Sequence, residues 1–269
     1  MKDYLRELVE NAPDPLRGRH IVREYLQARI LGSMQRTGAM VPLAFHGGTA
    51  LRFLYNIPRY SEDLDFALEG AADSYNLPAY LRAIHTDLLS EDYPIDVRLS
   101  DKHTVQSGMI RFRGLFHELG ISSHLDEVLS IKLEIDTKPP ASASLAVTVV
   151  RRHVILRLQH HDRASQLSGK LHAIFQRPFA KGRDLYDLLW YLSAADWPNP
   201  NLTMLNNALA QTGWQYGQLT SGNWRALTLE RLKSLDWTAV TNDVRPFLMN
   251  AGEADLMTLE TFENLLVHQ

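Results

Sequence analysis

The spacing of apolar residues predicts that the first 160 residues mix helices and strands. Between residues 4 and 34 the apolar side chains recur at helical spacing with an interruption at residues 11–15, which predicts two helices that cover a sheet. A further helix is predicted over residues 78–90. Alternating or continuous apolar runs predict strands over residues 41–45, 64–68, 95–99, 107–112 and 127–136, and one over 145–158 with a break near 151–153.

After His160 the pattern becomes helical and stays so. Two helices are predicted between residues 166 and 195, with a proline- and glycine-containing segment between them. Four more are predicted over residues 202–211, 221–235, 237–243 and 256–268. We therefore predict an α+β protein in which a domain of residues 1–159 is followed by a helical domain of residues 160–269.

The turn Gly47-Gly48-Thr49, between the first two predicted strands, is suited to binding phosphate. Glycine lacks a β-carbon, so the backbone can turn sharply and approach a bulky anion closely. The amides of Gly47 and Gly48 and the Thr49 hydroxyl could then point at phosphate oxygens. The helical spacing of residues 50–55 adds the positive end of a short helix dipole.

Two carboxylates follow, Asp63 and Asp65, in a strand pattern. Residues two apart in a strand share a face, so both carboxylates project together while Leu64, Phe66 and Leu68 enter the core. Close carboxylates repel each other unless a cation neutralises them, and oxygen ligands suit Mg²⁺. Each motif alone is weak, but in this order the two predict a site for a magnesium-bound nucleoside triphosphate.

A third acid is available in the predicted strand of residues 127–136, where Glu134 and Asp136 lie on one face. Geometry alone does not choose between them. Three acids could coordinate two Mg²⁺ ions that stabilise charge on phosphorus and on the leaving pyrophosphate, whereas fewer would still permit one.

The segment GGTALRFLYNIPRYSEDLDFAL resembles the signature of the AbiEii/AbiGii family of abortive-infection toxins, within the nucleotidyltransferase fold superfamily. The matching residues are Gly47, Gly48, Thr49, Arg59, Ser61, Asp63 and Asp65, with Thr49 where many members have serine. The resemblance implies a nucleotidyltransferase-like mixed sheet with flanking helices. It adds Ser61 to the nucleotide-binding residues, and the family's Lys-x-Glu-Ile pattern favours Glu134 as the third metal ligand.

The segment from Lys170 to Leu188 resembles the family's downstream Lys and Arg-Asp-x-x-Asp elements. The resemblance implies that Lys170 binds the triphosphate and that Asp184 orients this lysine or helps to activate the acceptor, so that the helical domain completes the active site. Asp184 and Asp187 are three apart and share a helix face. The alternative is a structural ion-pair network that joins two helices. Arg59 and Tyr60, next to the acidic strand, are further candidates for contact with a base or acceptor.

The implied activity is a magnesium-dependent transfer of a nucleoside monophosphate to an acceptor hydroxyl, with release of pyrophosphate. By resemblance the protein would be the toxin of a bacterial toxin–antitoxin pair, with tRNA as acceptor and an antitoxin that need not form a stable complex with it. The alternatives are a protein or small-molecule acceptor, such as an antibiotic, and a scaffold that binds nucleotide without turnover.

Composition restricts the kinds of metal site, the cellular location and the mode of RNA binding that the sequence allows. The 269 residues contain no cysteine, which excludes disulfides and thiolate metal sites, and no apolar run reaches membrane-spanning length. The N-terminus is too charged for a secretory signal, so we expect the cytoplasm. A net charge of −3 means that RNA binding requires a local basic patch, unless these charges are merely solvated. Candidate positions are Arg111, Arg113, Lys132, Arg151, Arg152, Arg157, Lys170, Arg177, Lys181 and Arg183.

Overall fold

The computed structural model describes residues 2–267, which form two compact units. The first unit contains the chain up to Leu54, then Tyr60–Lys138 and Val147–His160. The second contains Tyr55–Arg59, Pro139–Ala146 and the chain from His161 onward. The chain therefore passes between the units several times, and each unit is described by itself.

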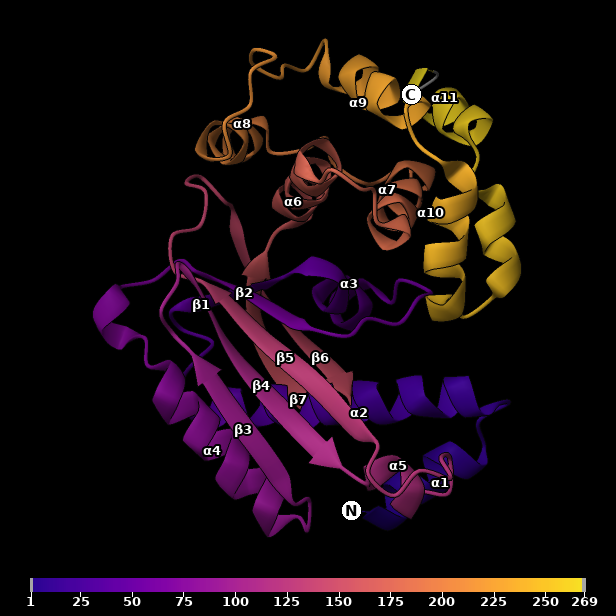
Figure 1. Cartoon of the computed structure of the whole chain (residues 1–269). Coiled ribbons are helices and arrows are strands. Elements are labelled where there is room, and N and C mark those ends of the chain that lie inside the picture. Colours follow the sequence, from indigo (N-terminus) through magenta and orange to yellow (C-terminus); the bar gives the residue numbers. More distant parts are fainter. Residues whose placement is uncertain (1, 268–269) are drawn as a thin grey trace. The chain divides into compact units, whose positions relative to one another are not determined.

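A mixed sheet, as the family resemblance implies, dominates the first unit (Figure 1), and it has seven strands where six were predicted. Its order is β3-β4-β5-β2-β1-β7-β6. The strands are β1 (Leu43–His46), β2 (Leu64–Leu68), β3 (Ile95–Ser100), β4 (Val105–Arg113), β5 (Val128–Asp136), β6 (Leu145–Arg152) and β7 (Val154–His161). Strand β2 is antiparallel to β1 but parallel to β5, whereas β4 is antiparallel to both β3 and β5.

One face of this sheet forms the core of the unit with α1 (Lys2–Glu10), α2 (Pro15–Arg36) and α4 (Leu77–Ser90). In β5 every second side chain is buried, from Leu129 to Ile135, while the residues between them are half-buried. This alternation leaves polar side chains on the other face. The unit also contains α3 (Gly47–Tyr55), α5 (Leu115–Glu118) and the 3₁₀ turn η1 (Ala72–Ser74).

Helix α2 has a defined start and fixes the segment that enters β2. The Asp14 side chain accepts a hydrogen bond from the Arg17 amide, and Pro15 occupies the first turn, where its missing amide hydrogen costs nothing. Further along α2, the buried amide of Gln27 donates to the backbone carbonyls of Ser61 and Glu62 at 3.1 and 2.9 Å. The residues just before the acidic strand are thereby held in place.

The second unit is helical. Its helices are α6 (Arg163–Gln176), α7 (Gly182–Ser193), α8 (Leu202–Gln211), α9 (Trp224–Lys233), α10 (Trp237–Val244) and α11 (Leu259–Val267), with 3₁₀ turns η2 (Arg245–Phe247) and η3 (Ala251–Leu256). Asp162 caps α6 by accepting from the Ser165 amide at 2.8 Å. Because the cap residue precedes the helix with extended backbone, it marks the change from strand to helix.

The structure confirms the predicted fold class and corrects parts of the element assignment. Residues 145–158 were expected to form one strand with a break, but they form β6 and part of β7, separated by His153 at a φ of 58°. The short helix α5 and the 3₁₀ turns were not predicted. The predicted end of the last helix, at residue 268, lies outside the described residues. Across residues 2–267, no helix combines the length and apolar character needed to cross a membrane.

Candidate functional site

The glycine turn packs directly against one of the predicted metal-binding carboxylates. Helix α3 begins at Gly47, immediately after β1, and Gly47 has a φ of 79°. A β-carbon at this position would lie 2.5 Å from Oδ2 of Asp65, well inside van der Waals contact. Glycine is therefore required both by the backbone conformation and by the closeness of the carboxylate.

Thr49 and Ser61 were predicted to bind nucleotide. In this structure both take part in hydrogen bonds that involve backbone carbonyls. Thr49 is fully buried, and its hydroxyl donates to the backbone carbonyl of Asp63. The Gly47–Thr49 turn is thus fixed to the segment that carries the first acid. Ser61 is half-buried and its carbonyl is held by Gln27. The predicted contacts of Thr49, Ser61 and the Gly48 amide with a nucleotide stay predictions.

The sheet register places two of the predicted acids side by side. Asp65 in β2 is the direct partner of Glu134 in β5, whereas Asp136 is the partner of Ala67 and accepts from the Lys138 amide at 2.9 Å. Asp63 lies just before β2, two residues from Asp65. Glu134, and not Asp136, is therefore the β5 carboxylate adjacent to Asp65.

A lysine lies among these acids. Nζ of Lys132 is 2.6 Å from Oε1 of Glu134, and both side chains are partly exposed. The hydrogen bond to Glu134, together with the charges of Glu134, Asp63 and Asp65, raises the pKa of Lys132 despite some burial. The sequence prediction treated Lys132 only as a possible RNA contact. Its position two residues before Glu134, on the same strand face, was the available signal of a counter-charge.

The donor chemistry of Asp63, Asp65 and Glu134 fits a divalent cation that prefers oxygen ligands, because all three groups are carboxylates: Asp65 and Glu134 are paired in the sheet, and Asp63 lies just before β2. Within residues 2–267, however, no three histidine, cysteine, aspartate or glutamate side chains are arranged as joint metal ligands. Glu134 is instead paired with Lys132. These residues thus supply a suitable donor set whose charge is partly balanced by a lysine.

The remaining predicted site residues form a buried ion-pair network in the second unit. Nζ of Lys170, on α6, lies 3.0 Å from Oδ1 of Asp184 and 2.7 Å from Oδ2 of Asp187, both on α7. Arg59 makes a two-point contact with Asp187, with Nε 2.5 Å from Oδ1 and Nη2 2.6 Å from Oδ2. Arg177 pairs with Asp184. This geometry resembles the alternative given above, a structural ion-pair network that joins two helices. The binding of a triphosphate by Lys170 stays a prediction.

Charge compensation offsets the effect of burial at Asp184 and Lys170. Burial raises the pKa of Asp184, but Lys170 and Arg177 outweigh it and leave the pKa lowered. Burial lowers the pKa of Lys170, but Asp187 and Asp184 outweigh it and leave the pKa raised.

The expectation that Arg59 and Tyr60 contact a base or acceptor is wrong. Arg59 is only 2% exposed and bound to Asp187, and Tyr60 is buried with its ring stacked on His20 at a centroid distance of 4.8 Å. Both side chains belong to the interior, because their neighbours are supplied by distant segments that the local sequence does not reveal.

Comparisons with known proteins identify relatives of the chain. The family model described as nucleotidyl transferase AbiEii toxin, type IV TA system, matches residues 29–267. Comparison with curated proteins gave no significant match.

Solved structures from Helicobacter pylori share the fold at low sequence identity. The Helicobacter pylori protein JHP933 is 20% identical, with a TM-score of 0.52 over 93% of this chain and 92% of that one. A candidate nucleotidyltransferase from Helicobacter pylori is 19% identical, with a TM-score of 0.54 over 91% and 94% of the two chains. The Mycobacterium tuberculosis nucleotidyltransferase toxin MenT4 is 18% identical over 98% of both chains, with a lower TM-score of 0.48.

Proposed function

Because the chain belongs to the nucleotidyl transferase AbiEii toxin family of type IV toxin–antitoxin systems, we propose that it moves a nucleoside monophosphate from a triphosphate to RNA, with Mg²⁺ as cofactor. The protein is a nucleotidyltransferase. Members of its family generally require a divalent metal, act on a nucleotide and are paired with an antitoxin. The choice of Mg²⁺, and of the tRNA 3′ end as the acceptor to test first, is our proposal.

The observation that most supports this proposal is the contact between Gly47 and Asp65, with Glu134 adjacent in the sheet. It brings a helix start, which attracts phosphate, against a carboxylate suited to holding a cation. A nucleoside triphosphate needs both kinds of contact, since it enters such sites as a metal complex.

In the proposed reaction the acceptor hydroxyl oxygen attacks the α-phosphorus. The bond from that phosphorus to the β-phosphate oxygen breaks, and pyrophosphate leaves with the electron pair while the hydroxyl proton is released. The bound cation would supply charge stabilisation at phosphorus. Asp63, Asp65 and Glu134 would hold it, the Gly47 turn would orient phosphate oxygens, and Thr49 would keep that turn aligned with Asp63. For Lys170 and Asp184 the family motif supports the predicted roles toward the triphosphate and the acceptor.

The direct test uses an Asp63→Asn, Asp65→Asn double variant with radioactive nucleoside triphosphates and total tRNA. We expect the variant to lose labelling of tRNA while its thermal unfolding stays cooperative, because amides keep the shape but not the charge. An Asp73→Asn, Asp101→Asn variant, which alters two exposed acids of the same unit, should label like the wild type. Undiminished labelling by the first variant would refute the mechanism.

The acceptor is tested separately. The wild-type protein is incubated with cell lysate and each labelled triphosphate in turn, and RNA, protein and small molecules are then separated. We expect label in the RNA fraction, in the size range of tRNA. Label confined to protein or to a small molecule would replace RNA by that acceptor without changing the chemistry.

We further propose that the protein acts in the cytoplasm, where triphosphates and tRNA are both present, and that its antitoxin counters it without a stable complex. Gel filtration of the two proteins mixed at micromolar concentration should give two separate peaks. A joint peak would contradict this part of the proposal.

A further inference from the structure

Three arginines share a sheet face with the predicted metal-binding acids. In β5, Leu129, Ile131 and Leu133 are buried, and the residues between them face the other way. Arg111 of β4 is the direct partner of Ser130 of β5, so it lies on the same face as Glu134. Arg113 lies two residues further along β4, and Arg98 of β3 is the partner of Met109 on this same face. We call Arg98, Arg111 and Arg113, with Asp96 between them, the arginine face.

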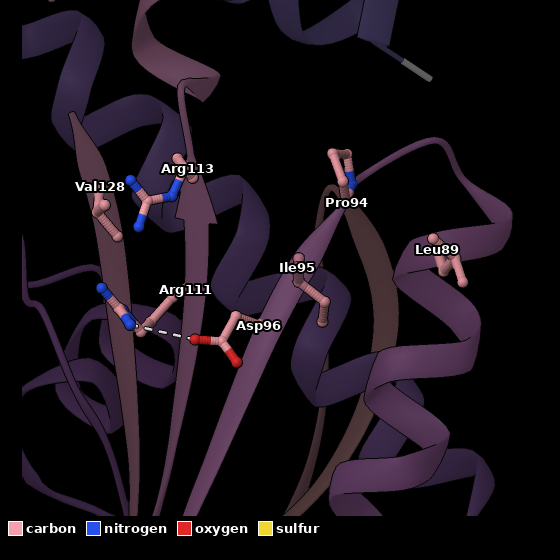
Figure 2. A pocket seen from close by; sticks show the side chains of 7 residues that line it. All are labelled: Leu89, Pro94, Ile95, Asp96, Arg111, Arg113 and Val128. Atoms are coloured by element: carbon pink, nitrogen blue, oxygen red, sulfur yellow. Dashed lines mark hydrogen bonds and ion pairs between the residues drawn. The ribbon is translucent and has the colours of Figure 1, made fainter. Parts of the chain in front are cut away.

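A pocket of about 260 Å³ lies beside the edge strand β3, where the arginine face borders residues of α4 and of the start of β3. Figure 2 shows the side chains of Arg111 and Asp96 meeting over the strands, with Arg113 above them and Pro94 and Ile95 at the side. The pocket therefore combines guanidinium groups with apolar surface. Its complete lining is Leu89, Pro94, Ile95, Asp96, Arg111, Arg113 and Val128.

The ion pairs that these arginines form with Asp96 and Asp126 can be broken at a small cost in free energy, so that another anion binds the arginines. Arg111 Nη1 lies 3.1 Å from Asp96 Oδ2, and Arg98 Nε lies 3.5 Å from the same oxygen. Arg113 Nη1 lies 3.3 Å from Asp126 Oδ1. The side chains of Arg98 and Arg113 are 70% and 65% exposed, and those of Asp96 and Asp126 are 57% and 87% exposed. The pairs of Arg98 and Arg113 are exposed and contribute little, and Arg111, itself 24% exposed, is paired with the exposed Asp96, so a phosphate can take the place of the carboxylates.

We infer that the arginine face binds the phosphate backbone of the single-stranded end of the RNA acceptor and leads that end toward Asp65 and Glu134. This inference rests on the proposed function, because it supplies a path for the acceptor of that reaction. Arginine is well suited to the task, since its planar group binds phosphate at two points and stacks on bases. Pro94, just before β3, and Val128, the β5 partner of Arg113, add apolar surface for a base in the lining of the pocket.

The spacing along the strands gives the length of this path. Ser130, opposite Arg111, is four residues from Glu134, which corresponds to about 13 Å at ~3.3 Å per residue. Val128, opposite Arg113, is six residues away, or about 20 Å. At ~3.4 Å per stacked nucleotide, these distances match roughly four to six nucleotides.

The test measures RNA binding and its dependence on salt. Fluorescence anisotropy is recorded with a labelled RNA hairpin that carries a six-nucleotide 3′ overhang, for the wild type and for Arg111→Ala, Arg113→Ala. For single strands the slope of log K against log salt is about −0.7 per neutralised phosphate, so we expect the slope to become shallower by about 1.4. The matched control, Arg6→Ala, Arg82→Ala, removes two exposed arginines from α1 and α4 of the same unit and should bind like the wild type.

Two further readouts separate a direct contact from a folding defect. Asp96→Asn removes the negative charge between Arg98 and Arg111, so we expect tighter RNA binding, whereas a purely structural role of Asp96 would give weaker binding. With overhangs of one to eight nucleotides, wild-type affinity should rise up to about four to six nucleotides. The double arginine variant should lose this dependence on length.

The outcomes distinguish this inference from the proposed function. Unchanged RNA affinity and salt slope in Arg111→Ala, Arg113→Ala would overturn the arginine face, while labelling of tRNA that depends on Asp63 and Asp65 would still support the transferase. If the wild type binds no RNA but labels a protein, both the RNA acceptor and this surface are wrong, and an acidic protein segment becomes the partner to test.

Discussion

At the scale of single residues, the absent side chain of Gly47 determines how closely the backbone turn can approach Asp65. We expect Gly47→Ala to lower the transfer rate at least tenfold. Its methyl group would lie 2.5 Å from Oδ2 of Asp65, so the Asp65 carboxylate would have to move. The positive φ adds a destabilisation of about 1–2 kcal/mol. Gly38→Ala is a matched control, since Gly38 has the same φ of 79° but no heavy atom within 4 Å of the position that a methyl group would take.

The comparison of these two variants separates strain from contact. Chemical denaturation should give similar losses of stability from the backbone strain, with a further loss in Gly47→Ala from the clash. Only Gly47→Ala should slow the labelling of acceptor. Equal activity of the two variants would show that the approach of Gly47 to Asp65 is unimportant for the reaction.

Lys132 acts as a counter-charge that a cation must compete with. Lys132→Met keeps the length of the side chain but removes its charge, so Glu134 becomes available to a metal ion. For a partly exposed pair worth about 0.2–1 kcal/mol, we expect the Kd for Mn²⁺, measured by calorimetry, to fall by up to about fivefold. Lys102→Met, which alters an exposed lysine, should leave the Kd unchanged. Weaker metal binding by Lys132→Met would contradict the counter-charge role.

The sequence predicted the types of residue at the site better than their partners. The alternation in residues 127–136 put Glu134 and Asp136 on one face but could not choose between them, because the choice depends on the register with β2. Likewise, Thr49 was expected to face phosphate, and nothing local indicates that its hydroxyl bonds to the carbonyl of Asp63. Register and burial arise from long-range pairing, which a single sequence does not encode in its local pattern.

At the scale of elements, a buried ion network joins α6, α7 and the segment that contains Arg59. Asp187 is completely buried and contacts both Arg59 and Lys170. Asp187→Ala should therefore destabilise the protein by about 3–5 kcal/mol, because it leaves two buried cations that have lost this partner. Asp255→Ala removes the partner of Arg245 in an exposed pair and should cost no more than about 1 kcal/mol. Urea unfolding measures both, and similar losses would contradict the role of burial.

The same network predicts a dependence of stability on pH. The pKa of Asp184 is lowered in the folded protein, so its contribution to stability is present above the ordinary aspartate pKa of about 3.9 and is lost as the pH falls through the folded value. Asp184→Asn cannot titrate, so we expect it to be less stable than the wild type at pH 7 but to lose less stability as the solution is acidified.

Urea unfolding at a series of pH values tests this, with Asp255→Asn as the exposed control. Parallel pH profiles for the wild type and Asp184→Asn would show that Asp184 does not contribute in this way.

The elements themselves were largely predictable, because helix and strand periods are local signals. The acidic strand over residues 64–68 and the helix over residues 202–211 have the predicted bounds. The break near residues 151–153 was predicted, but its separation of two strands, β6 and β7, was not, because the apolar alternation continues on both sides of His153. A non-glycine residue at positive φ is uncommon, so a histidine at that position is only a weak indication of a turn.

At the scale of the whole molecule, the two compact units exchange segments along the chain. Tyr55–Arg59, which lies between the glycine turn and the acidic strand in sequence, belongs to the helical unit, as does Pro139–Ala146. Periodicity could predict a change to helices after His160, but it could not predict these exchanges, because they involve a few residues without a distinctive pattern. We therefore propose that the simple division into residues 1–159 and 160–269 does not give two independent folding units.

This proposal predicts the behaviour of the two fragments. Residues 160–269 alone lack Arg59, so Asp187 keeps its contact with Lys170 but loses the two-point contact with the guanidinium group in a buried position. A buried charge that loses a partner costs about 3–5 kcal/mol, a large part of the stability of a domain. We expect this fragment to show no cooperative thermal transition by circular dichroism, whereas the full-length protein unfolds cooperatively. The Asp187→Leu version of the fragment should recover part of the helical signal, because leucine removes the charge that Arg59 no longer balances. A wild-type fragment as stable as the full-length protein would show that this unit does not need Arg59.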